Sequence, residues 1–339
     1  MIASGTGVGS LPGADVRAAV RMVVDAAADA GSALVHLPEL PGRGAAASLT
    51  GRGVGLLADL AADLQPAGWR LTGGGVTAAG GGLDQRRARS LLGEDLDALE
   101  EHTQGWGGTV KVQVAGPWTL AATIERPRGD RVLADHGARR ELAQSLAEGV
   151  TGHIADVRRR VPGADVVLQL DEPGLPAVLA GSVPTASGFG RHRTVVAAEA
   201  SEALATVLGA AASAGARPVV HCCATAVPVA LLAGAGATAV SLDTSLLTRP
   251  EIDALAAVVH GGVDLWPGMD LLGDGDAAVD ALLRLLDALD LGPQAAAPRT
   301  VVTPSCGLAG ASPAAAAQAY ARAHRLARQL SEADGKMHV

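Results

Sequence analysis

Two cysteines and a histidine have the types and spacing of metal ligands. His221 and Cys223 are separated by one residue in the segment V-V-H-C-C-A. Because side chains alternate along an extended strand, these two point to one face and Cys222 points to the other. Cys306 follows a second strand-like run in T-P-S-C-G-L, and Asp243 in S-L-D-T-S offers a carboxylate. Zn²⁺ accepts such S, N and O donors tetrahedrally, so we predict a zinc site of His221, Cys223, Asp243 and Cys306.

Some of these residues also have a simpler interpretation. Free cysteine is among the most buried residue types, and we favour this interpretation for Cys222. An aspartate at a strand end is often only the N-cap of the next helix, which leaves the role of Asp243 open. For His221, Cys223 and Cys306 we favour metal binding, because all three come at the ends of strand-like runs.

Carboxylates and a glycine-rich turn form a second group of candidates. Asp171 and Glu172 end the apolar segment L-Q-L-D-E-P, where a buried carboxylate is costly unless a cation or a donor meets it. We interpret both as ligand-binding acids; the alternative is that Asp171 caps the turn before Pro173. In V-G-S-L-P-G, the backbone N–H groups of Gly9 and Ser10 can form an anion cradle, although the motif is also ordinary turn chemistry.

These candidates follow short apolar runs that have the character of β-strands. Such runs alternate with longer segments of helical period, which is typical of repeated βα units on a parallel sheet. The predicted strands are 2–9, 33–37, 109–115, 165–170, 217–221, 237–242, 262–266 and 299–303. The predicted helices include 14–30, 86–102, 138–160, 195–214, 277–289 and 313–330. The glycine- and proline-rich tracts 41–55, 73–82 and 292–298 are interpreted as loops.

Strands and helices in this alternation favour a closed (β/α)8 TIM barrel, with residues 1–339 as one domain. A dinucleotide-binding open sheet is disfavoured, because G-T-G-V-G-S-L-P places Pro12 where a helix would begin turning. In such a barrel the catalytic groups lie at the C-terminal ends of the strands. The reactive polar residues at those ends are Ser10, His36, Glu39, Gln113, Asp171, Glu172, His221, Cys223, Asp243, Thr303 and Cys306.

Composition excludes several function classes. The formal net charge of the 339 residues is -8, and no basic cluster is available to neutralise phosphates, so we expect no nucleic-acid partner. No apolar stretch reaches the ~20 residues of a membrane span, and the N-terminus lacks the pattern of a signal peptide. An odd set of 3 cysteines argues against a disulfide framework. We therefore expect a cytoplasmic protein with reduced thiols.

Several motifs occur along the chain in a fixed order. They are G-S-L-P, H-x-x-E from His36 to Glu39, G-P-W-T-L, L-D-E-P, H-C-C, S-L-D-T-S and P-S-C-G-L. In this order they resemble the catalytic half of cobalamin-independent methionine synthase, from about Gly7 to the C-terminal helix. The combination of H-x-C with P-x-C-G-L is specific, whereas no single motif is. The resemblance implies a methyltransferase in which homocysteine, held by zinc as a thiolate, takes a methyl group and becomes methionine.

The resemblance also implies roles for single residues. The zinc ligands would be His221, Cys223, Cys306 and Asp243, with Asp243 standing where the family uses glutamate. The contacts to homocysteine would be Gly9, Ser10, Glu39 and Asp171. In that arrangement the backbone cradle holds the α-carboxylate and the acids hold the α-ammonium. The default methyl donor of the family is 5-methyltetrahydrofolate.

Departures from the family concern the methyl donor. The complete enzyme has two barrels and this chain has one. The segment P-G-M-D-L-L-G has no histidine at the place of the family's proton donor. The position of a stacking tryptophan falls at Thr123, and that of a folate-holding glutamate falls near Ala177. A folate nitrogen must be protonated to leave, whereas a Co(I) corrinoid leaves without a proton. A methylcorrinoid, presented by a carrier protein, is therefore an alternative donor.

Three other interpretations stay open. The acceptor can be a thiol other than homocysteine. A uroporphyrinogen decarboxylase-like barrel is a related fold, but it needs no metal thiolates, so H-C-C together with Cys306 argues against it. A zinc- or thiol-binding paralogue without catalysis is compatible with the missing acid.

Overall fold

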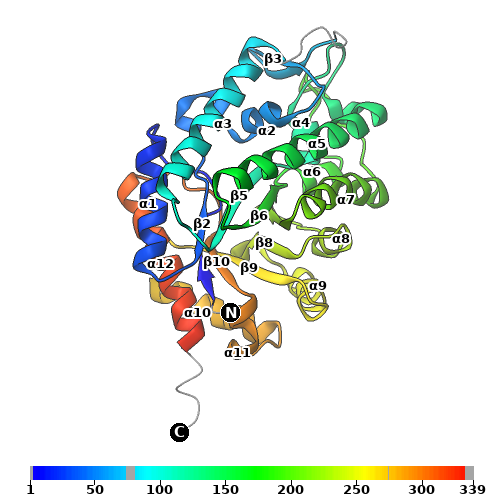
Figure 1. Ribbon diagram of the computed structural model, residues 1–339. Helices are drawn as coiled ribbons and strands as arrows, with labels where there is room; N and C mark the ends of the chain where they lie inside the picture. Colours follow the sequence, from blue (N-terminus) through cyan, green and yellow to red (C-terminus); the bar gives the residue numbers. More distant parts are fainter. Residues whose placement is uncertain (1–2, 74–80, 274, 333–339) are drawn as a thin grey trace.

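Eight parallel strands form the centre of the molecule in the computed structural model, which describes residues 3–73, 81–273 and 275–332. The strands are β1 (Ser4–Gly5), β2 (Leu34–His36), β5 (Thr109–Ala115), β6 (Asp165–Asp171), β7 (Ala216–Cys222), β8 (Ala239–Asp243), β9 (Asp264–Met269) and β10 (Val301–Pro304). Their order in the sheet is β1-β10-β9-β8-β7-β6-β5-β2, and helices surround them (Figure 1). The fold is therefore the (β/α)8 barrel that the sequence predicts.

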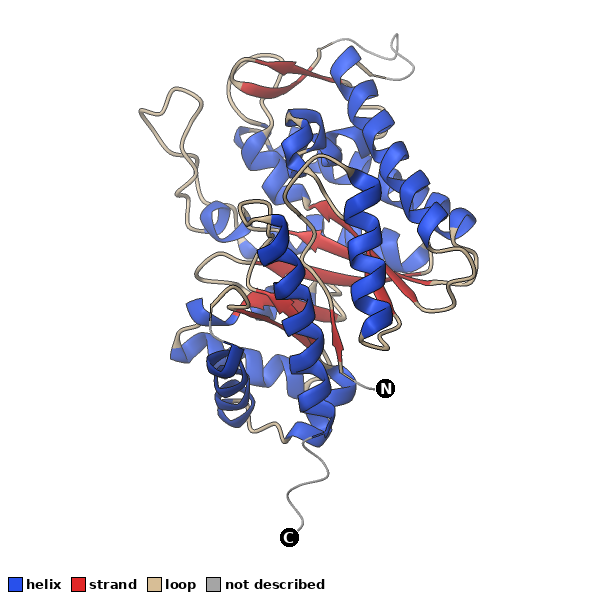
Figure 2. Ribbon diagram, turned by 90° about the vertical axis from the view of Figure 1, so that its left-hand side faces the viewer, coloured by secondary structure: helices blue, strands red, loops and turns tan. Residues whose placement is uncertain are grey.

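Helices form the outer layer of the barrel, as Figure 2 shows from a second direction. They are α1 (Val16–Asp29), α2 (Leu49–Leu56), α3 (Leu83–His102), α4 (Pro117–Thr123), α5 (His136–Arg160), α6 (Leu175–Leu179), α7 (Ala197–Ser213), α8 (Val229–Gly234), α9 (Arg249–His260), α10 (Gly275–Ala288), α11 (Pro293–Ala296) and α12 (Pro313–Glu332). Short 3-10 helices are η1 (Pro41–Arg43), η2 (Ala45–Ala47), η3 (Val132–Ala134), η4 (Thr244–Leu246) and η5 (Ala297–Arg299). None of the described helices is long and apolar enough to cross a membrane.

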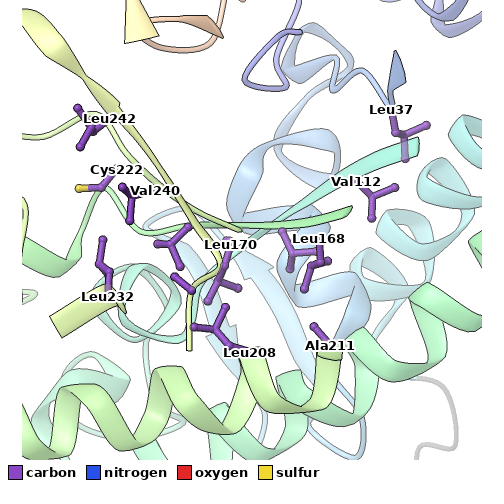
Figure 3. Close-up of a cluster of buried hydrophobic side chains, with 14 of the residues drawn as sticks. Leu37, Val112, Leu168, Leu170, Leu208, Ala211, Cys222, Leu232, Val240 and Leu242 are labelled. Atoms are coloured by element: carbon purple, nitrogen blue, oxygen red, sulfur yellow. The ribbon is translucent and has the colours of Figure 1, made fainter. Parts of the chain in front are cut away.

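Alternation along the strands separates an outer core from the barrel interior. Leu168 and Leu170 of β6 face the helices, where they pack near Leu208 and Ala211 of α7 (Figure 3). Residues at the alternate positions, such as Gln169, face the barrel axis. A small apolar cluster at the lower end of the interior contains Val167, Val219, Ala239 and Trp266. Nearer the C-terminal ends of the strands the inward side chains are polar. The predicted site therefore lies over a packed apolar cluster.

The barrel closes between β1 and β2, which stand at the two ends of the sheet order. Beyond their ends a parallel bridge joins Ser10 to Glu39. The N–H of Leu11 donates to the Glu39 carbonyl at 2.8 Å, and the N–H of Glu39 donates to the Gly9 carbonyl at 3.1 Å. Two segments that carry predicted site residues therefore complete the barrel wall.

Side chains fill this seam below the bridge. The ring of Tyr320 from α12 stacks on His36 with 5.4 Å between ring centroids, and its hydroxyl lies 2.8 Å from Nε2. Gly7 passes so close that a Cβ there would lie 1.9 Å from the Tyr320 hydroxyl oxygen. β1 ends at Gly5, earlier than the predicted strand 2–9, of which Ile2 lies outside the described part of the chain.

Other differences from the predicted elements arise in glycine-rich segments. The tract 41–55 contains η1, η2 and most of α2, because Ser48 caps α2 and its glycines allow close packing: a Cβ on Gly51 would lie 2.1 Å from the Ala45 carbonyl oxygen. After α2 comes a hairpin of β3 (Ala62–Gln65) and β4 (Gly68–Leu71) that the sequence does not predict. Most of the predicted loop 73–82 lies outside the described residues, and the tract 292–298 contains α11 and the start of η5.

Candidate metal centre and amino-acid site

Three of the predicted metal ligands converge at the C-terminal end of the barrel. His221 lies at the end of β7, Cys223 follows it, and Cys306 lies in the loop after β10. One ligand atom from each residue lies within 4.8 Å of the others, and no other group of three such residues is found in the described chain. The two sulfur atoms are 2.8 Å apart, well beyond the ~2.05 Å of a disulfide bond, and both are free thiols.

His221 presents one nitrogen to this cluster and has the other fixed. Its Nδ1 lies 2.9 Å from the hydroxyl oxygen of Ser241 on β8. Its Nε2 is buried and has no hydrogen-bond partner among the described residues. A buried polar atom without a partner is costly, and a ring held through its other nitrogen is how proteins orient metal-binding histidines. The orphaned nitrogen and the two sulfurs therefore fit a zinc ion.

The cysteine side chains differ in their acidity. The contact with the Cys223 thiol and the nearby His221 ring lower the pKa of Cys306 to about 4, and the same contact between the thiols raises the pKa of Cys223. Cys222 points the other way, into the apolar core beside Leu232, Val240 and Leu242 (Figure 3). Burial raises the pKa of Cys222 to about 12. The pair that faces the cluster thus offers a thiolate, and Cys222 stays a thiol.

Asp243 is not part of this cluster. Its Oδ1 accepts from the N–H of Ser245 at 2.9 Å and from the Ser245 hydroxyl at 2.6 Å, which caps η4. The helix-cap interpretation therefore describes its side chain, and the structure assembles three of the four predicted ligands. Zinc held by three protein ligands keeps a fourth position for substrate or water, which is the arrangement of catalytic sites.

The predicted amino-acid contacts lie beside these ligands. Asp171 on β6 is the register partner of His221, and it is almost completely buried. The N–H of Leu308 donates to the Ser10 carbonyl at 2.8 Å, which ties the loop of Cys306 to the cradle segment. Burial and the nearby charge of Glu39 raise the pKa of Asp171 well above its usual range. A cationic group of a ligand would relieve this crowding of acids.

Glu172 is engaged inside the protein. Its carboxylate accepts from the N–H of Trp118 at 2.9 Å, from the N–H of Thr119 at 2.8 Å and from the Thr119 hydroxyl at 2.7 Å. These bonds satisfy free donors at the N-terminus of α4. The expectation that Glu172 binds substrate stays a prediction, but in the structure the residue holds α4 against β6.

Sequence patterns miss two charged residues that support the site. Lys111 on β5 is completely buried inside the barrel. Arg52 on α2 lies between two acids. Its Nε is 3.4 Å from Oε1 of Glu39, and its guanidinium group donates a hydrogen bond to Asp95. The only available signal is compositional: Lys111 is one of just two lysines among the 27 basic residues, which gives a lysine inside an apolar strand unusual weight.

Solved structures of similar shape are barrel enzymes. A B12-independent methionine synthase from Shewanella sp. W3-18-1, in complex with selenomethionine, matches with a TM-score of 0.63 and 14% identity over 98% of this chain and 99% of that one. GH5_18 from Streptomyces cattleya, in complex with GlcNAc, has a TM-score of 0.48 and 14% identity over 97% of this chain and 81% of that chain. No protein-family model and no curated protein matches the sequence. At such identities the likeness shows the fold. The chain is a (β/α)8 barrel.

Proposed function

We propose that this protein is a zinc-dependent thiol S-methyltransferase that converts homocysteine to methionine. The observation that carries the proposal is the convergence of His221, Cys223 and Cys306 on one point, beside two buried acids, Glu39 and Asp171. A thiol-binding metal site next to a site for an ammonium group suits an amino acid with a thiol side chain. The similarity in fold to a methionine synthase in complex with selenomethionine supports the same substrate class.

The chemical requirement is a sulfur nucleophile. A free thiol has a pKa of ~8.5 and is mostly protonated at neutral pH, whereas the thiolate is the nucleophile. Zinc held by His221, Cys223 and Cys306 would keep the acceptor sulfur as a thiolate. The sulfur then takes the methyl group, a new C–S bond forms, and the donor leaves with the electron pair of its former bond to carbon.

The residues of the chain place the acceptor. Glu39 and Asp171 bind its α-ammonium group, and the backbone at Gly9 and Ser10 holds its α-carboxylate. Ser241 keeps the ring of His221 aimed at the cluster. Holding both ends of a small acceptor fixes the line along which its sulfur meets the methyl group, which can supply a large part of the rate.

The methyl donor is 5-methyltetrahydrofolate by default, and a methylcorrinoid is the second candidate. The end of β9 presents Asp270, whose Oδ1 accepts from the N–H groups of Leu272 and Gly273 at 3.1 Å each. His36 is buried in the seam against Tyr320. His36 is enclosed in the seam and Asp270 is engaged through Oδ1, so we assign to neither the protonation of a departing folate nitrogen, a task for which one general acid is typically worth ~10² to 10⁴ in rate. This favours a donor that leaves without a proton.

Metal content and turnover test the proposal together. We expect about one zinc per chain, and methionine formation from homocysteine with methylcobalamin faster than with methyltetrahydrofolate bearing one or several glutamates. Vigorous turnover with the folate alone would assign the donor to folate. A protein that holds no metal even after zinc addition, and makes no methionine with either donor, would contradict the function.

A further inference from the structure

We infer that Lys111 is a positioning residue for the amino-acid end of the acceptor, acting through Gln169 on Asp171 and through the Val8 carbonyl on the cradle segment. The inference rests on the proposed function, because that function gives Asp171 and the cradle their ligand. Lys111 itself lies beneath them in the barrel interior and touches neither of the thiols.

All the donors of the Lys111 ammonium group are used. Its Nζ lies 2.7 Å from the carbonyl oxygen of Val8, 3.0 Å from Oε1 of Gln169 and 3.1 Å from Oε1 of Gln113. These partners come from three parts of the barrel: the segment after β1, β5 itself, and β6. A single side chain thus ties together the elements that carry the predicted amino-acid contacts.

The ammonium group also decides which way both glutamine amides face. Because it can only donate, each amide must turn its oxygen toward Lys111 and its NH₂ group away. The Nε2 of Gln169 accordingly donates to Oδ1 of Asp171 at 2.7 Å and to the Val8 carbonyl at 2.9 Å. The Nε2 of Gln113 donates to the Leu37 carbonyl at 2.6 Å, two residues before Glu39. The ammonium group on one side and these acceptors on the other therefore fix the same orientation of each amide.

Charge points to the same role. Asp171 and Glu39 are the acids that face Lys111, and His36 is the other titratable group beside it. Burial lowers the pKa of Lys111 to about 8, although the two acids act in the opposite direction. Within the described residues no carboxylate bonds to Nζ directly, so the charge acts on both acids at a distance and leaves their free oxygens for the ligand. Arg52 already lies 3.4 Å from Glu39, so Asp171 is the acid that depends on Lys111 for its internal counter-charge, and the ammonium group of a ligand would complete its pairing.

A spectroscopic test uses the rarity of lysine. With ¹³C-lysine labelling the chain has two Cε signals, and Lys336→Gln assigns them. We expect the Lys111 signal to titrate near pH 8, and its midpoint to move to lower pH in Asp171→Asn, because that variant removes a negative charge. An identical midpoint in parent and variant would show that Lys111 and Asp171 are not coupled, and would overturn the inference whatever the chain catalyses.

A kinetic test separates positioning from general support. In Lys111→Met, the KM for homocysteine should rise about ten-fold or more. The KM for 4-mercaptobutyrate, which lacks the amino group but keeps the carboxylate that the cradle holds, should rise much less, and the zinc content should stay unchanged. Gln169→Met keeps the cation but breaks the link to Asp171, and should show the same selective loss. Equal losses with both thiols would mean a structural role only and would refute the inference. A parent protein that shows the lysine coupling yet ignores homocysteine would refute the proposed function instead.

Discussion

Among single residues, Ser241 shows how one strand prepares a ligand on the next. Its hydroxyl contacts His221 Nδ1 and no cysteine, so it acts on the metal only through the orientation of the ring. We predict that Ser241→Ala weakens zinc binding about 10- to 100-fold, measured by competition with a coloured chelator. Ser245→Ala is the matched control, because Ser245 contacts Asp243 instead. Equal zinc affinity in Ser241→Ala and the parent would deny Ser241 this role.

Cys222 and Cys223 point to opposite sides at the end of β7, so their substitution should have different effects. Cys223→Ser or Cys306→Ser should abolish zinc retention, because each removes a thiolate from a three-residue cluster. Cys222→Ser should keep the metal but lower the free energy of unfolding by about 1–3 kcal/mol, because it places a hydroxyl in an apolar core. Metal analysis and urea unfolding measure both effects. Loss of zinc in Cys222→Ser would reverse the assignment of the faces.

Asp171 is where the amino group of the acceptor is expected. Asp171→Asn keeps the shape of the side chain and removes its charge, so homocysteine binding should weaken by about 1.5–3 kcal/mol with zinc content unchanged. Calorimetry on the zinc-loaded protein measures this difference. If parent and variant bind homocysteine equally, the carboxylate only stabilises its own turn.

At the level of elements, Glu172 is expected to matter for stability. It accepts three hydrogen bonds at the start of α4, so Glu172→Ala should lower the free energy of unfolding by about 1–3 kcal/mol. Thr119→Val removes only the bond from the hydroxyl and should cost less. Urea unfolding compares the two variants. A fully stable Glu172→Ala with impaired homocysteine binding would instead place this carboxylate on the substrate.

Predicted and observed elements agree where nearby residues determine the bounds of the element, and they differ where residues distant in the sequence do. The strand 109–115 has the bounds of β5, because alternation within seven residues defines it. β9 continues to Met269 although the sequence predicts an end at 266, since Pro267 and Gly268 resemble a turn but lie in a sheet paired on both sides. β1 is shorter than predicted, and Tyr320, whose ring crowds Gly7 beyond the end of this strand, stands more than three hundred residues further along the chain.

The same distinction holds for the site. Strand alternation alone places His221 and Cys223 on one face, and the structure brings Cys306 to them. Asp243 and Glu172 are acids at strand ends like Asp171, but each finds hydrogen-bond donors nearby, from Ser245 and from the start of α4. The cap of Asp243 is local, since its donors lie two residues away, whereas no local pattern reveals the donors of Glu172, which come from a different βα unit. Lys111 is missed for a related reason: its partners come from three separate strands or strand ends.

At the scale of the whole molecule, the residues that close the barrel are also residues of the predicted site or their direct neighbours. The Ser10–Glu39 bridge and the bonds from Lys111 and Gln169 to the Val8 carbonyl cross the seam that no regular ladder covers. The predicted substrate contacts thus lie where the barrel wall has the fewest regular backbone hydrogen bonds, between β1 and β2. Binding of an acceptor across Gly9, Ser10 and Glu39 would add contacts over this seam, so it should stabilise the fold as well as occupy the site.

Buried histidines make the stability of the whole molecule depend on acid. Burial lowers the pKa of His153 and of His324 to about 4, and lowers that of His36 well below its ordinary value. Below pH 6.5 the unfolded chain takes up protons at these rings while the folded chain does not, so the free energy of unfolding falls as pH falls toward 4. His153 and His324 should each contribute a loss of about 1.6 kcal/mol between pH 6.5 and 5, and His36 acts in the same direction.

His153 allows the contribution of a single histidine to the pH dependence of stability to be measured. Its Nε2 has no hydrogen-bond partner within the described residues, so His153→Leu costs little at pH 7.5. Urea unfolding at pH 7.5 and at pH 5 should then show a smaller loss of stability in His153→Leu than in the parent, by about 2 kcal/mol. Zinc release at low pH affects both proteins equally and cancels in the difference. A parent and a variant that lose the same free energy between the two pH values would show that the His153 ring is protonated inside the fold, with water or a neighbouring acid reaching it.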